Sequence, residues 1–70
     1  MINEHVDQAV DLLGGPSQAA KALGVSPSFI CQMRDGLKAV PAIRALQFER
    51  ATAGAVRAVD LCPALVEVAA

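Results

Sequence analysis

Apolar side chains recur every three or four residues at the start of the chain, which is the spacing of an amphipathic helix. Between Ile2 and Leu13 they leave acidic residues on the opposite face. Asn3 is a residue type that caps helix N-termini, and the Gly-Gly-Pro run at 14–16 stops a helix. The pattern therefore predicts a first helix from about Asn3 to Leu13.

The same periodicity predicts three more helices, each bounded by a capping or breaking residue. In chain order they are Ser17–Leu23 with Ser17 as cap, Pro27–Arg34 between the cap Ser26 and the stop Gly36, and Pro41–Ala53 before Gly54. On the last of these, Ala42, Ala45 and Phe48 mark the expected inner face. Leu46 adds apolar surface beside that face, and Ile43 is expected to be partly exposed.

The segment from about 55 to 70 fits two structures. Val56 and Val59 suit a short strand or another turn of helix, and Pro63 interrupts the segment. Bulky apolar residues at a chain end need burial, against the domain itself or against a second copy. We favour the second copy and expect a dimerisation tail built from Leu61, Leu65, Val66 and Val68.

Residues of about 16–36 have the pattern of a DNA-binding helix-turn-helix within a single domain, 1–70. Ala20 lets two helices approach closely, and Gly24 can adopt the left-handed backbone of the turn. Leu23, Ile30 and Met33 fall where the motif needs core-facing groups. In such a unit the second helix enters the major groove.

Candidate DNA contacts follow from this geometry. The expected base-contacting residues are the outward positions Pro27, Ser28, Phe29, Cys31 and Gln32. Gln32 is the strongest of them because an amide can bind adenine N6 and N7 together. For Phe29, packing in the core is the equally weighted alternative. The expected phosphate contacts are the start of the second helix and the following cations: Ser17, Gln18, Arg34, Lys38 and Arg44.

Charge and composition narrow the function. The formal net charge is −1, but residues 17–50 hold five of the six cations and only two acids, so positive charge gathers around the DNA-reading unit. No signal peptide or membrane-spanning run is seen, which predicts a cytoplasmic protein. His5, Cys31 and Cys62 do not have zinc-site spacing, and no catalytic set is present, so we expect no metal, no cofactor and no enzyme activity.

Two segments carry a family resemblance. GGPSQAAKALGVSPSFICQMRDG and the later VPAIRALQFERATAGAV resemble the small Cro-like prophage regulators, including the YdaS-like group. The resemblance implies an all-α, lambda-repressor-like domain of four to five helices, whose C-terminal tail is either helical or a short strand. It also implies a repressor that binds double-stranded operator DNA as a homodimer. The sequence departs from the family at Phe29, Cys31, Met33 and Ile43, so the operator is not transferable.

Two other functions compete with the repressor. An antitoxin-type regulator would use the apolar tail to bind a protein toxin, and its DNA binding would be autoregulatory. A protein-interaction module would have kept the fold and lost DNA binding, and the low net charge and the residues Phe29 and Cys31 favour it.

Overall fold

The computed structural model describes residues 2–65, and this part of the chain contains helices and no strand. The helices are α1 (Glu4–Leu13), α2 (Pro16–Leu23), α3 (Pro27–Arg34), α4 (Ala42–Ala51) and α5 (Ala58–Leu61). The predicted all-α helix-turn-helix class is confirmed. None of the helices within residues 2–65 has the length and apolar character that crossing a bilayer requires.

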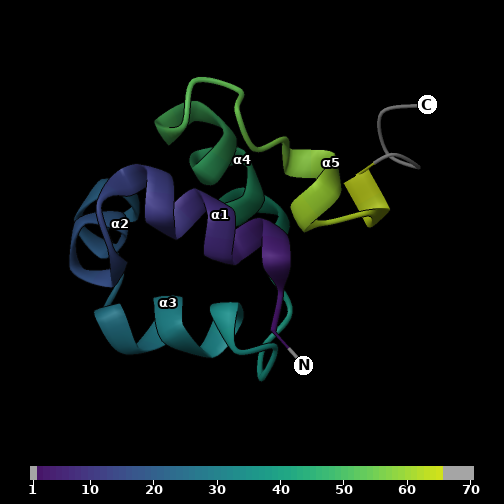
Figure 1. The fold of residues 1–70 in the computed structure, drawn as a ribbon. Helices are drawn as coiled ribbons and strands as arrows, with labels where there is room; N and C mark the ends of the chain where they lie inside the picture. The colour runs from purple at the N-terminus through teal and green to yellow at the C-terminus, as the bar shows by residue number, and fades with distance from the viewer. Residues whose placement is uncertain (1, 66–70) are drawn as a thin grey trace.

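Helix α1 lies at the centre of the domain, with α3 on one side of it and α4 and α5 on the other (Figure 1). Its predicted cap is confirmed, since Asn3 Oδ1 accepts the N–H groups of His5 and Val6, both at 3.1 Å. Val6, Ala9 and Val10 are buried on its inner face. The core is built largely from small and aliphatic side chains, with Phe48 as its largest fully buried member.

Helix α2 begins one residue earlier than predicted. Pro16 is its first residue, Gly15 occupies the cap position, and no side chain caps the helix. Ser17 was expected to be the cap, and this was wrong: the fixed φ of proline and its missing N–H make Pro16 the natural first residue. Ser17 consequently lies exposed in the first turn.

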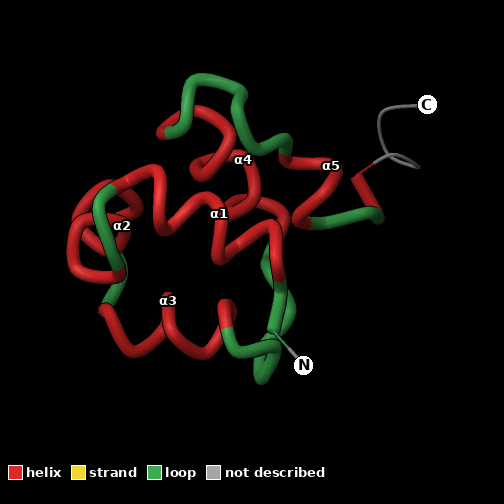
Figure 2. The backbone as a smooth tube through the Cα atoms, in the orientation of Figure 1, coloured by secondary structure: helices red, strands yellow, loops and turns green. Residues whose placement is uncertain are grey.

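The turn between α2 and α3 has the predicted chemistry. Gly24 adopts a left-handed φ of 72°. Ser26 Oγ caps α3 by accepting the N–H of Phe29 at 3.2 Å. Ala20 is buried where the two helices meet, and Ile30 and Met33 are fully buried beneath α3. The short green turn between the two red helices is visible in Figure 2.

Helix α4 ends at Ala51, two residues before the predicted end. Thr52 terminates it, because its Oγ1 donates to the Phe48 carbonyl at 2.8 Å and accepts the Val56 N–H at 3.2 Å. Ala45 and Phe48 are buried as predicted. Ala42 was expected on the inner face, and this was wrong: it is the first residue of α4 and is exposed.

The tail is helical as far as it is described, so the strand alternative is not observed. Helix α5 is held by Glu49 of α4, whose Oε1 accepts the Ala58 N–H at 2.8 Å. Leu61 is only 4% exposed in the core of its own chain, so almost none of its surface is left for the subunit contact expected of it. Leu65 is half-buried against the same core, and Val66 and Val68 lie outside the described residues.

Candidate nucleic-acid interface

The outward face of α3 is set by the two side chains that point inward. Ile30 and Met33 are fully buried, and helical periodicity places Ser28, Cys31 and Gln32 on the opposite side. Ser28 is exposed, whereas Cys31 and Gln32 are half-buried. The expected base-contacting positions therefore share one face, with the exposed Pro27 at its N-terminal end.

Phe29 lies at the edge of this face and has contacts on two sides. Its ring packs partly buried against the core cluster. The Nζ of Lys38 lies 5.7 Å from the ring centroid, within range of a cation–π interaction. The core packing that was weighed as the alternative for Phe29 is present, and its ring is less available to a base than the side chain of Ser28.

The loop after α3 folds back along that helix. The N–H groups of Leu37 and Lys38 both donate to the Gln32 carbonyl, at 2.9 and 3.2 Å. Gly36 makes this reversal with a left-handed φ of 79°. As a result, the exposed Lys38 is held beside the outward face of α3 and close to Gln32 in space.

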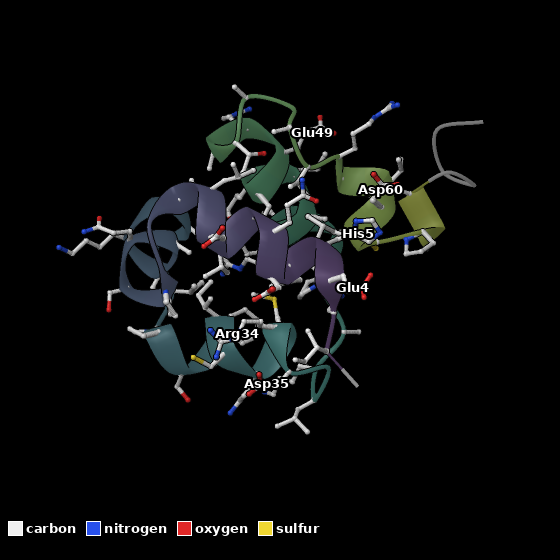
Figure 3. The ribbon with its side chains drawn as sticks, in the orientation of Figure 1. Glu4, His5, Arg34, Asp35, Glu49 and Asp60 are labelled. Carbon is white, nitrogen blue, oxygen red and sulfur yellow. The ribbon has the colours of Figure 1, made fainter. Side chains whose placement is uncertain are left out.

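Arg34 and Asp35 project from the end of α3 (Figure 3). Arg34 Nε lies 3.5 Å from Asp35 Oδ1, and Arg34 Nη2 lies 3.8 Å from Cys31 Sγ. Asp35 was not among the predicted site residues. It follows Ser28 by seven residues and Cys31 by four, so helical periodicity places its carboxylate on the same outward face. That spacing was the signal that could have found it.

Arg44, an expected phosphate contact, makes hydrogen bonds within the chain. Its Nη1 donates to the Leu23 carbonyl at 3.3 Å and to Gln47 Oε1 at 2.8 Å. Gln47 Nε2 donates to the same Leu23 carbonyl at 3.3 Å. The last carbonyls of a helix have no partner inside it, so these two side chains close the C-terminus of α2. Sequence reasoning missed Gln47, although it stands one turn after Arg44.

The start of α2 remains open. Ser17 and Gln18 are both exposed in its first turn, and no side chain bonds the first N–H groups of the helix. A helix N-terminus of this kind favours anions through its free N–H groups and its dipole. Of the expected phosphate contacts, Ser17 and Gln18 are exposed, and the exposed Lys38 has its cation–π contact with Phe29. Arg34 and Arg44 have polar partners within the chain.

Other chemistry finds little support in the described part of the chain. Within residues 2–65, no three metal-ligating side chains come together. Cys31 and Cys62 are both half-buried free thiols.

Comparison with known proteins supports the family. Residues 6–67 match the model of the family called "Bacterial toxin YdaS". A relative from Escherichia coli (strain K12), described as "Putative transcriptional regulator YdaS", is 41% identical over 61 residues. The match covers 87% of this chain but only 62% of the relative, so the chain spans less than two thirds of that protein's length. No solved structure matches the chain significantly. The helix-turn-helix geometry, the family match and the identity to this relative show that the chain belongs to the YdaS family.

Proposed function

We propose that this chain is a sequence-specific transcriptional repressor of Cro type, which binds double-stranded operator DNA as a dimer. The observation that carries the proposal is the outward face of α3. Ser28, Cys31 and Gln32 stand there together, and α2 packs across the inner side of the same helix. A face of this kind can enter the major groove, where donors and acceptors of the four base pairs differ.

In this proposal the groups around α3 divide between base reading and backbone binding. Gln32 donates and accepts through its amide against an adenine edge, and Ser28 bonds to a base or a phosphate. Ser17, Gln18 and the N–H groups at the start of α2 bind one phosphate stretch, and Lys38 binds another. Because few cations are available to bind phosphates, one copy of the chain binds DNA weakly. Two linked copies on a two-fold symmetric site bind it more tightly. Repression is steric, because the bound dimer occupies a site that overlaps a promoter.

Selection of bound duplexes from a randomised DNA library tests the proposal. The proposal expects an enriched palindrome, protected as two half-sites in a footprint, and an affinity that falls steeply with salt. Recovery of unenriched DNA by folded protein, at every salt concentration, would contradict it.

The word toxin in the family name favours a second candidate, in which the chain inhibits growth. We propose another protein as its target in that case. The relative described as a transcriptional regulator favours DNA as the target. One assay is therefore needed that distinguishes a DNA target from a protein target. Growth after induction of the wild type and of Gln32→Ala separates them. Toxicity that persists in Gln32→Ala, although this variant no longer distinguishes the operator from other DNA, would support a protein target. Toxicity that falls together with operator discrimination would support promoter occupancy.

A further inference from the structure

Helix α4 has an outward face that nothing in the described chain covers. Ala45 and Phe48 are fully buried on its inner side. On the opposite side lie two large aliphatic side chains, Ile43 at 64% and Leu46 at 53% exposed, followed by Arg50. The outward positions also include Gln47, whose amide is turned to the Leu23 carbonyl, so Arg50 carries the one charge among these four positions. A surface helix ordinarily keeps its polar residues on this side, so the face is more apolar than solvation requires.

The spacing on this face is that of a helix–helix seam. Ile43, Leu46 and Arg50 are separated by three and then four residues, the interval of the core positions in a coiled coil. Two shallow hollows flank them. One is lined by Ile43, Leu46, Gln47 and Arg50, and the other by Leu46, Glu49, Arg50, Ala53 and Gly54. A ridge with a hollow on each side can accept the same ridge from another helix.

Charge on this face supports a second copy in one orientation. Among residues 2–65 the single ion pair joins Arg34 and Asp35, so Arg50 has none. Its neighbour Glu49 uses Oε1 for the Ala58 N–H, which fixes the carboxylate and leaves Oε2 for another donor. In a parallel pair of α4 helices, Arg50 of one chain would lie against Arg50 of the other, and the two charges would repel. An antiparallel pair sets the stem of Arg50 over Leu46 and brings its guanidinium within reach of Glu49 of the second copy.

We propose that the outward face of α4 is a homodimer surface, in which two copies of α4 pack antiparallel about a two-fold axis midway between Leu46 and Arg50. This rests on the proposed function for its dimeric state and names the surface that joins the copies. One helix face buries less than the roughly 800 Å² per partner of a standard interface, so the dimer is weak in solution. Binding of both copies to one DNA would strengthen it.

Sedimentation equilibrium without DNA tests the proposal, over protein concentrations from about 10 µM to 1 mM. The wild type is expected to shift from monomer to dimer in this range, and Leu46→Glu to raise the dissociation constant by about tenfold or more. The matched control is Leu12→Glu, because Leu12 on α1 is 55% exposed against 53% for Leu46. Arg50→Glu is expected to weaken the dimer as well, and Arg57→Glu, the same charge change at an exposed site outside the face, to leave it unchanged. Circular dichroism confirms that each variant is folded.

Each other outcome overturns the proposal. A wild type that stays monomeric throughout, or equal losses in Leu46→Glu and Leu12→Glu, shows that α4 is not the contact. A variant that stops after Leu65 distinguishes this surface from the tail. If that variant loses the dimer and Leu46→Glu keeps it, the contact belongs to the tail. Because DNA is absent from these measurements, their failure leaves the DNA-binding proposal untouched.

Discussion

Arg44 on α4 donates from Nη1 to the carbonyl of Leu23 at the end of α2, across 3.3 Å. The bond ties the first helix of the helix-turn-helix unit to the helix that follows it. Because this bond and the bond to Gln47 engage the half-buried guanidinium, we expect Arg44 to act in stability rather than as a phosphate ligand.

Replacing Arg44 by Ala should therefore lower stability and leave the electrostatics of DNA binding nearly unchanged. Loss of its two hydrogen bonds costs about 1–3 kcal/mol in the free energy of unfolding, because hydrogen bonds to charged groups are worth that much when partly buried. Urea denaturation measures the cost, with Arg57→Ala as the exposed control. An unaltered free energy of unfolding, together with a salt slope reduced by one phosphate contact, would show that Arg44 binds DNA instead.

Lys38 is expected to show the reverse behaviour. It is exposed beside α3, so Lys38→Ala removes a phosphate contact and weakens binding to all duplexes alike. The slope of log affinity against log salt should fall by about 1. Fluorescence anisotropy at several salt concentrations gives the slope, and Lys21→Ala on α2 is the matched exposed lysine. The prediction fails if Lys38→Ala changes preference among sequences and keeps the wild-type slope.

Asp35 places a negative charge on the face that would meet DNA. Its side chain is 48% exposed, and Arg34 Nε at 3.5 Å neutralises it only in part. Asp35→Asn should tighten binding to specific and non-specific duplexes by roughly fivefold at low salt, since one repulsion of about 1 kcal/mol is removed. Asp60→Asn on α5 makes the same change in net charge away from this face. Equal gains in both variants would mean that net charge alone, and no local repulsion at α3, controls affinity.

Glu49 is expected to matter for the position of α5. Glu49→Ala removes the acceptor of the Ala58 N–H and should destabilise the domain by about 1 kcal/mol. Thermal unfolding of Glu49→Ala beside Glu4→Ala, an exposed acid on α1, checks it. A destabilisation no larger than that of Glu4→Ala would show that α5 is held by its apolar contacts alone.

The sequence predicted the α1 cap and the α2–α3 turn well, because these features depend on local chemistry. Asn3, Gly24 and Ser26 each act on residues no more than four positions away. The end of α4 was missed although Thr52 acts over the same short range, on Phe48 and Val56, because Gly54 two residues later is the more typical helix stop. The prediction that Ser17 caps α2 was wrong because the adjacent Pro16 suits the first helical position better.

The candidate site was predictable where it follows the period of one helix, as Ser28, Cys31 and Gln32 do. It was not predictable where partners are distant in the chain. Arg44 and Leu23 are 21 residues apart, so nothing local to Arg44 reveals that its guanidinium is occupied. Similarly, Lys38 reaches Phe29 only because the loop after α3 turns back on Gln32.

Gln32 on α3 is the proposed base reader, and the discrimination lost in the Gln32→Ala variant is the sharpest test of that role. Binding of wild type, Gln32→Ala and the control Gln8→Ala is measured on a selected operator and on its single-base variants. We expect Gln32→Ala to lose about 1–3 kcal/mol of discrimination at one base pair per half-site, with non-specific affinity nearly intact and Gln8→Ala unchanged. An equal loss of affinity for every duplex would contradict it.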